Sequence, residues 1–129
     1  MGTNYYAYRN VCERCGRGDE PLHIGKSSAG WCFSLHVYPE LGLTDWPEWE
    51  EYLAKVTSVV RDEYGEAVTL EGLRQRVTER AWNGQPSSAT WLRENHAVAG
   101  PKGLARHCLN DRCIKNGAGT WDCLVGDFS

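Results

Sequence analysis

The chain lacks the features that assign a protein to a membrane, a secretory pathway or a nucleic acid. No apolar run approaches the roughly 18 residues that indicate a membrane-spanning helix. The N-terminus has none of the charged, apolar and small-residue blocks of a secretion signal, and Tyr6 stands where a myristoylation motif needs Ser or Thr. The net charge of −3 leaves no basic stripe for nucleic acid. We therefore expect a cytoplasmic protein with no membrane partner, for which nucleic acid is disfavoured.

Repeats, low-complexity segments and convincing linkers are also missing. A chain of 129 residues is expected to form a single domain with one modest core, in which 1–38 is the metal-binding region and 39–129 the helical and strand remainder. Six tryptophans and six tyrosines are many for this length. Such aromatic side chains either build a small core from large pieces or form a binding surface.

Local patterns predict an α+β protein with a small antiparallel sheet and two to three helices. Asp45 offers an N-cap, and Trp46, Trp49 and Leu53 then recur at helical spacing. Thr69 is expected to cap a second amphipathic helix. Strands are expected at 4–9, 22–27, 31–37, 58–61, 67–68 and 119–125, and helices at 46–57, 70–82 and 89–95.

Residues 22–37 are expected to form a β-hairpin around a short turn. With Ala29-Gly30 as a two-residue turn, His23 lies opposite His36. Because side chains alternate between the two faces of a strand, both histidines fall on one small, polar face, while Lys26 falls on the other, otherwise apolar face. The apolar face is expected to hold Leu22, Ile24, Trp31, Phe33 and Leu35, and the polar face Gly25, Ser27, Cys32 and Ser34.

Cys12 and Cys15 are the strongest candidate metal ligands. Six cysteines in a cytosolic chain are better explained by metal ligation or free thiols than by disulfides. A structural zinc ion needs four protein ligands, of which a Cys-x-x-Cys pair supplies two. His23 and His36, with Cβ atoms about 5 Å apart in the expected hairpin, complete a C-x2-C-x7-H-x12-H set. We therefore expect one structural Zn²⁺ held by these four residues.

Two alternatives to this ligand set stay open. Cys32 shares the expected polar face and could replace one of the histidines. A second group near the C-terminus could bind its own metal, or its cysteines could be buried as small hydrophobes. A thioredoxin-type redox role for Cys12 and Cys15 is disfavoured, because the residues after them are typical of a loop. The second group consists of His107, Cys108, Cys113 and Cys123.

The run Gly25-Lys26-Ser27 matches the end of a phosphate-binding P-loop. The complete motif also needs a glycine five residues before Gly25, and Glu20 stands there with a carboxylate that repels phosphate. The run also continues into a hairpin, whereas a P-loop opens a helix. The sequence therefore does not predict a P-loop. No fixed spacing ties Lys26 or the serines to a catalytic triad.

Three stretches resemble a family of small, uncharacterised bacteriophage proteins: GTNYY at 2–6, CxxCG at 12–16 and LHIGKSSAGW at 22–31. GTWD at 119–122 and GDFS at 126–129 are similar as well. The resemblance implies a phage origin and action in the cytoplasm of the infected cell. It includes Cys12, Cys15, His23 and His36, and it carries no known activity.

These observations predict a zinc-stabilised phage accessory protein that binds a host protein and modulates its activity, in host takeover or counter-defence. One alternative is a metal-dependent or small-molecule-acting enzyme that uses the polar face of the hairpin, around Lys26, Ser27 and Ser34. The other is a nucleic-acid-binding zinc module, which the acidic pI near 5.8 disfavours.

Overall fold

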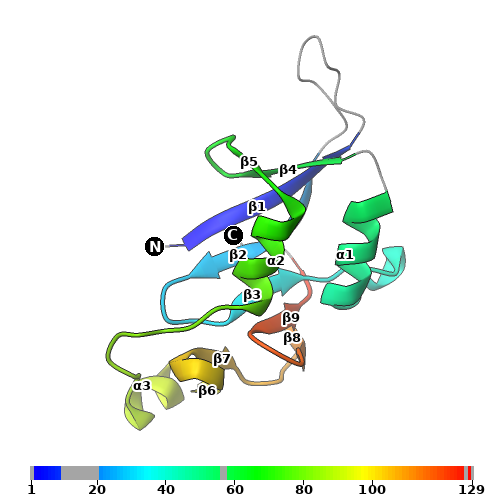
Figure 1. The fold of residues 1–129 in the computed structure, drawn as a ribbon. Helices are drawn as coiled ribbons and strands as arrows, with labels where there is room; N and C mark the ends of the chain where they lie inside the picture. The colour runs from blue at the N-terminus through cyan, green and yellow to red at the C-terminus, as the bar shows by residue number, and fades with distance from the viewer. Residues whose placement is uncertain (1, 10–20, 56–57, 127, 129) are drawn as a thin grey trace.

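The computed structural model describes residues 2–9, 21–55, 58–126 and 128 (Figure 1). Its centre is a seven-stranded sheet with the order β5-β4-β1-β2-β3-β9-β8. All neighbours in this sheet are antiparallel except β3 and β9, which are parallel. The strands are β1 (Gly2–Arg9), β2 (Leu22–Ser28), β3 (Phe33–His36), β4 (Ser58–Asp62), β5 (Ala67–Val68), β8 (Cys113–Asn116) and β9 (Trp121–Leu124).

A smaller two-stranded sheet and three helices complete the described residues. The α+β class is therefore confirmed, but the main sheet is larger than expected and mixed rather than antiparallel. Short 3-10 turns lie at Pro39–Leu41 and Pro101–Gly103. The remaining elements are α1 (Trp46–Lys55), α2 (Leu70–Thr78), α3 (Ala89–Glu94), β6 (Ala97–Ala99) and β7 (Ala105–His107).

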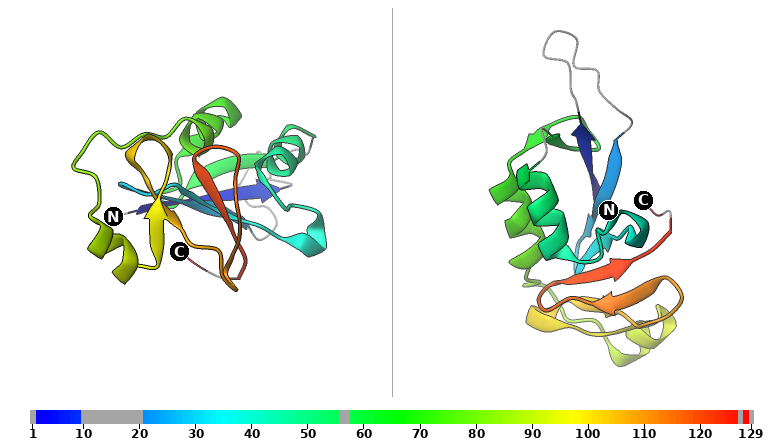
Figure 2. Two further views of the ribbon diagram at one scale, coloured as in Figure 1. Left: turned by 90° about the horizontal axis from the view of Figure 1, so that it is seen from below. Right: turned by 90° about the vertical axis from the view of Figure 1, so that its right-hand side faces the viewer.

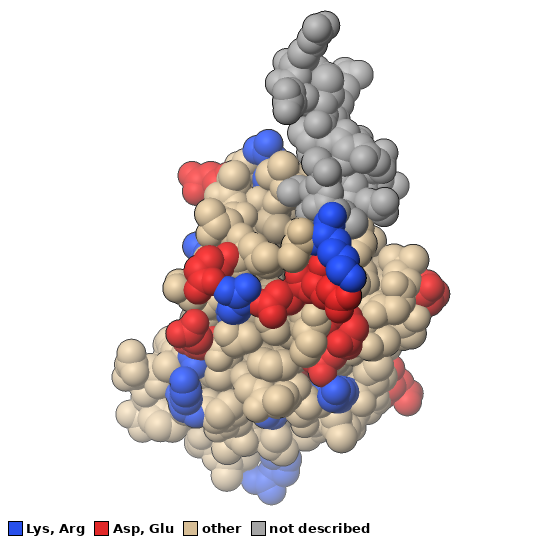
Figure 3. Space-filling view, turned by 45° about the vertical axis from the view of Figure 1, so that its right-hand side comes forward, with Lys and Arg blue, Asp and Glu red and all other residues tan. Residues whose placement is uncertain are grey.

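Helices α1 and α2 cover one face of the main sheet (Figure 2). Thr69 Oγ1 accepts a hydrogen bond from the Gly72 N–H at 2.9 Å, which is the capping bond expected at the start of α2. Asp45 Oδ1 accepts a hydrogen bond from the N–H of Trp46, the first residue of α1, at 2.8 Å. Acidic and basic side chains are interspersed over the helix-bearing side of the molecule (Figure 3). No described helix is long and apolar enough to cross a membrane.

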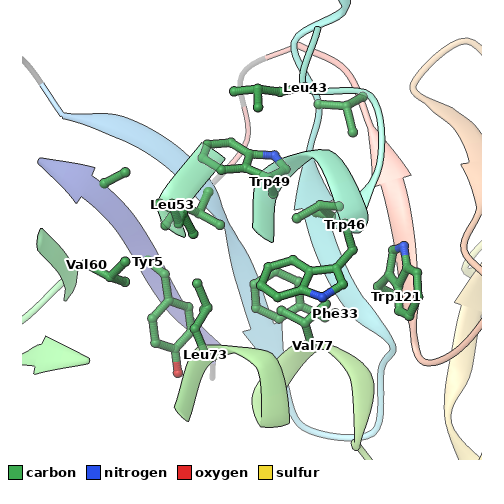
Figure 4. Close-up of a cluster of buried hydrophobic side chains, with 14 of the residues drawn as sticks. Tyr5, Phe33, Leu43, Trp46, Trp49, Leu53, Val60, Leu73, Val77 and Trp121 are labelled. Atoms are coloured by element: carbon green, nitrogen blue, oxygen red, sulfur yellow. The ribbon is translucent and has the colours of Figure 1, made fainter. Parts of the chain in front are cut away.

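The hydrophobic core lies between these two helices and the sheet (Figure 4). Trp49 is fully buried, and its indole N–H donates to the His36 carbonyl at 2.7 Å, which fixes α1 against β3. Phe33, Leu73 and Val77 are also fully buried there. The tryptophans are not all in the core. Trp46, Trp49 and Trp121 are buried there, whereas Trp82 and Trp91 are exposed.

The β2–β3 hairpin has a register one residue away from the predicted one. Lys26 pairs with Ser34, whereas a two-residue turn would have paired it with Phe33. The connection is longer because it includes Trp31, whose N–H donates to the Ser28 carbonyl at 3.1 Å. The shift moves Lys26 to the face of Ser34. The prediction that Lys26 lies on the apolar face is therefore wrong.

A β-bulge in β2 brings the two histidines back together. The register of β1 and β2 shifts by one residue between Tyr5 and Tyr6, with Ile24 as the extra residue. A one-residue slip reverses the face that the following side chains take. His23 therefore shares a face with His36, although the register beyond the bulge would place the two on opposite faces. The predicted histidine pairing is confirmed, through a different geometry.

The second helix and the C-terminal strands differ from the predictions. Helix α2 ends at Thr78 rather than near Trp82. Beyond it the Arg80 guanidinium donates to the Ser28 and Trp31 carbonyls, at 2.8 and 3.0 Å, which holds the chain against the hairpin turn. Strands β6, β7 and β8 were not predicted, because each is three or four residues long and none shows a clear alternation of apolar and polar residues.

Candidate functional site

The face of the sheet opposite α1 and α2 carries the polar side chains. The registers place Asn4 beside Lys26, Lys26 beside Ser34, and Ser34 beside Asp122, so these four share one face. The alternate positions of the same strands lie in the core. We call this surface the polar face. It consists of Asn4 and Tyr6 of β1, His23, Lys26 and Ser28 of β2, Ser34 and His36 of β3, and Asp122 and Leu124 of β9.

A pair of histidines forms the centre of the polar face. His23 Nδ1 lies 3.0 Å from His36 Nδ1, and His23 Nε2 lies 2.8 Å from Asn4 Oδ1. The Asn4 amide is oriented by Glu63, whose Oε1 accepts from Asn4 Nδ2 at 3.4 Å and from the Asn4 N–H at 2.7 Å. With Asn4 Oδ1 accepting from Nε2–H, a neutral His23 presents the Nδ1 lone pair toward His36.

Aromatic rings enclose the histidine pair. Tyr38 stacks on His36 with ring centroids 4.1 Å apart, and its hydroxyl donates to the His23 carbonyl at 2.9 Å. Phe128 lies 4.9 Å from the His23 ring and 5.1 Å from the His36 ring. Tyr6 approaches His23 from the β1 side at 5.3 Å. His36 is only 5% exposed, so its imidazole is held with little access to water.

This geometry is compatible with metal binding at the two Nδ1 atoms. Two nitrogen ligands on one tetrahedral zinc ion lie about 3.3 Å apart, close to the observed 3.0 Å. A ligating histidine commonly donates its other N–H to a carbonyl or carboxylate, as His23 does to Asn4. Cys12 and Cys15 lie outside the described residues.

The other candidate ligands are not gathered around a metal position. No group of three or more His, Cys, Asp or Glu side chains suited to a metal occurs among residues 2–9, 21–55, 58–126 and 128. Cys32 precedes His36 by four residues in one extended run, which corresponds to about 13 Å. His107, Cys108, Cys113 and Cys123 are likewise not brought into such a group.

The buried thiols are protonated at neutral pH. Burial is the main reason that the pKa of Cys32 and the pKa of Cys113 are both raised to about 11, and the pKa of Cys123 to about 12. A thiolate, not a thiol, attacks electrophiles and ligates metals. The burial of Cys113 and Cys123 fits the second of the two roles considered for the C-terminal cysteines, whereas Cys108 is only partly buried.

A buried ion pair borders the polar face and was missed in the sequence. Asp122 is fully buried, and its carboxylate accepts from Arg106 Nε at 2.7 Å, Asn116 Nδ2 at 2.8 Å and the His107 N–H at 3.0 Å. Arg106 also donates to the Gly119 and Trp121 carbonyls, at 2.7 and 2.8 Å. The pair joins β7, β8 and β9. Nothing local marks Asp122, because its partners come from two other strands, β7 and β8.

A cavity of about 410 Å³ opens on the polar face beside the histidine pair. Lys26, Ser28, Trp31 and Ser34 line it from the hairpin, and His107, Arg112 and Phe128 from the C-terminal part of the chain. The prediction of a polar pocket around Lys26 and Ser34 therefore agrees with the structure, except that Ser28 lines it in place of Ser27. Ser28 is on the face of Lys26 because the two lie two residues apart on one strand.

Comparisons with known proteins identify neither a family nor a fold relative of this chain. No protein-family model matches the chain, and neither a curated protein nor a solved structure does.

Proposed function

We propose that this protein is a zinc-stabilised phage accessory protein that acts in the host cytoplasm by binding a host protein. The observation that carries the zinc proposal is the approach of His23 Nδ1 to His36 Nδ1 at 3.0 Å, with Asn4 orienting the first ring. Cys12 and Cys15 would supply the other two ligands. A site with four protein ligands leaves no position for water, so the ion would stabilise the fold rather than catalyse a reaction.

The position of the histidine pair explains what such an ion would stabilise. His23 lies at the start of β2 and His36 at the end of β3. An ion bound there together with Cys12 and Cys15 would tie the β1–β2 connection to the middle of the sheet. Structural zinc contributes about 10–16 kcal/mol in small domains, so its removal is expected to unfold this region.

An apolar hollow supports the binding of a protein partner. It measures about 610 Å³ and is formed by residues of α3, His96, residues of β6 and residues 108–110, which follow β7. Val98 and Leu109 at its border are 46% and 62% exposed. Among the described strands β6 pairs with β7 alone, so β6 is an edge strand of the small sheet. Exposed apolar patches and open strand edges are common docking surfaces in protein complexes.

Elemental analysis of the purified protein tests the zinc proposal. We expect one zinc per chain, with loss of both zinc and folded structure in Cys12→Ser and His36→Ala. His96→Ala is the matched control, because His96 is exposed and is not in contact with the histidine pair. Protein purified without chelator that contains no metal would refute the proposal. Zinc retained at full stoichiometry by His36→Ala would show that this ligand is wrong.

Affinity capture from host lysate, followed by direct binding of the purified partner, tests the proposal that this protein binds a host protein. Leu109→Ser and Val98→Ser should weaken the complex at least about tenfold, because each removes an apolar side chain from the proposed interface. Leu41→Ser is the control, since Leu41 is 57% exposed but lies in the turn before α1. Equal affinities in all three variants would exclude the hollow as the docking surface.

A further inference from the structure

We propose that the cavity on the polar face binds a small phosphate monoester with a planar ring, of the size of a nucleoside monophosphate. This inference goes beyond the proposed function and does not rest on zinc. Pockets for small ligands commonly measure about 300–1,000 Å³, and the cavity, at about 410 Å³, lies in that range. Its lining divides into a cationic, hydrogen-bond-donating part and an aromatic part, which match the two parts of such a ligand.

Lys26 forms the cationic part, and Arg112 borders the same cavity. Lys26 is half-buried, and no carboxylate of the described residues forms an ion pair with it. Among the described residues, none of those that line the cavity is Asp or Glu. The hydroxyls of Ser28 and Ser34 add neutral donors beside the ammonium group. Phosphate is bound in proteins by just such charge-assisted hydrogen bonds from Lys and Arg, with hydroxyls in support.

The carboxylate on the neighbouring strand β9 does not cancel this charge. Asp122 is beside Ser34 in the sheet, but it is fully buried and is bound by Arg106, Asn116 and the His107 N–H. Its negative charge is therefore balanced by the guanidinium of Arg106, behind the cavity. Among the described residues, the charge presented to a ligand is that of Lys26.

Backbone features direct the lysine into the cavity. The one-residue shift of the hairpin register places Lys26 on the polar face. At Gly2 of β1, a Cβ atom would overlap Lys26 Cε, so glycine leaves room for the lysine stem across the neighbouring strand. Lys26 and Ser28 belong to the run that resembled a P-loop. They take part here as side chains of one strand face, without the glycine loop or the helix that a P-loop requires.

The aromatic part of the lining is held by stacking. Trp31 stacks on His107 with ring centroids 4.7 Å apart and an interplanar angle of 26°, and Trp91 supports it from 5.5 Å. Phe128 lines the cavity next to the histidine pair. Burial lowers the pKa of His107, so its ring is neutral at physiological pH. Neutral aromatic rings in a partly enclosed site favour a flat apolar group, such as a nucleobase.

Isothermal titration of the full chain with AMP, GMP, CMP and UMP tests the proposal, with adenosine and inorganic phosphate as partial probes. We expect one nucleotide per chain, with adenosine at least about tenfold weaker because a charge-assisted hydrogen bond is lost. Lys26→Met should weaken AMP by a similar factor. Lys55→Met is the matched control, because Lys55 is an exposed cation on α1, on the other side of the sheet. Trp31→Leu should weaken AMP but not inorganic phosphate.

Three results would overturn the assignment. The first is the absence of binding by all four nucleotides at millimolar concentration. The second is equal affinity of Lys26→Met and Lys55→Met for AMP, and the third is adenosine binding as tightly as AMP. Inorganic phosphate binding as tightly as AMP would exclude the aromatic part of the proposal. The unfolding midpoint of each variant, measured in parallel, shows that a loss of affinity is not a loss of folding.

Discussion

Replacing Asp122 with Asn tests the buried ion pair that joins β7, β8 and β9. The carboxylate has two acceptor atoms that receive three hydrogen bonds, from Arg106, Asn116 and the His107 N–H. In Asp122→Asn one of these atoms becomes an NH₂ donor. At the Oδ1 position it would face two donors, and at the Oδ2 position it would face the His107 N–H. Each orientation buries donors without acceptors.

The expected loss follows from the burial of both partners. Asp122 is fully buried and the Arg106 side chain is 15% exposed, so solvent screens the pair weakly. Breaking a buried pair while its other charge stays in place costs about 3–5 kcal/mol. Because small domains are stable by about 5–15 kcal/mol in total, the variant should lose a large fraction of its free energy of unfolding.

Urea unfolding at neutral pH measures the effect, provided that the dependence on denaturant is the same for both proteins. Glu51→Ala is the control, because the Glu51–Lys55 pair is exposed on both sides and its loss should leave the midpoint unchanged. Arg106→Lys should also destabilise the protein, since an ammonium group cannot serve the Asp122 carboxylate and the carbonyls of Gly119 and Trp121 together. An unchanged urea midpoint in Asp122→Asn would refute the reasoning.

Three further predictions concern the residues that support the polar face. Burial lowers the pKa of His107 and outweighs the opposing effect of Asp122. Below about pH 6.5 the unfolded chain therefore binds more protons than the folded chain. The free energy of unfolding should fall as the pH drops through that value toward the folded-state pKa. His107→Gln should flatten this dependence in urea midpoints measured from about pH 7 to about pH 5, and an unchanged dependence would contradict the effect of burial. Arg80→Met leaves the Ser28 and Trp31 carbonyls without their donor and should lower the free energy of unfolding in urea by about 1–3 kcal/mol. A loss no larger than that caused by the exposed control Arg93→Met would contradict the role of Arg80. Gly25→Ala should lower the thermal midpoint by several degrees, because the alanine Cβ would overlap the Ser34 carbonyl and the Phe33 ring. An unchanged midpoint would mean that the bulge adapts without strain.

Short-range signals in the sequence were sufficient for the helices and for the first hairpins. The N-caps Asp45 and Thr69, and the spacing of Trp46, Trp49 and Leu53, identify α1 and the start of α2. The turn after Asp62 likewise predicts the β4–β5 hairpin, in which Val60 pairs with Val68. These signals act within a few residues of one another, so their physical effect is contained in the local sequence.

The histidine pair was predictable in outcome but not in geometry. The alternation of side chains places His23 and His36 together if the turn has two residues, and they do lie together. The actual turn includes Trp31, and the bulge at Ile24 reverses the effect of that extra residue. A bulge depends on how β1, β2 and β3 pair at once, which no single segment encodes.

What the sequence by itself determined are the features whose causes are local: the α+β class, the helix starts, the early hairpins and the side-chain chemistry available for a metal or an anion. The tertiary structure alone decided the parallel pairing of β3 with β9, the strands β6 to β8, the Asp122–Arg106 pair and the cavity beside Lys26. Ser34 and Asp122 are far apart along the chain, yet they are neighbours in the sheet. Such contacts form only when distant segments bury their apolar faces against a common core, so their partners are set by packing and not by the residues next to them.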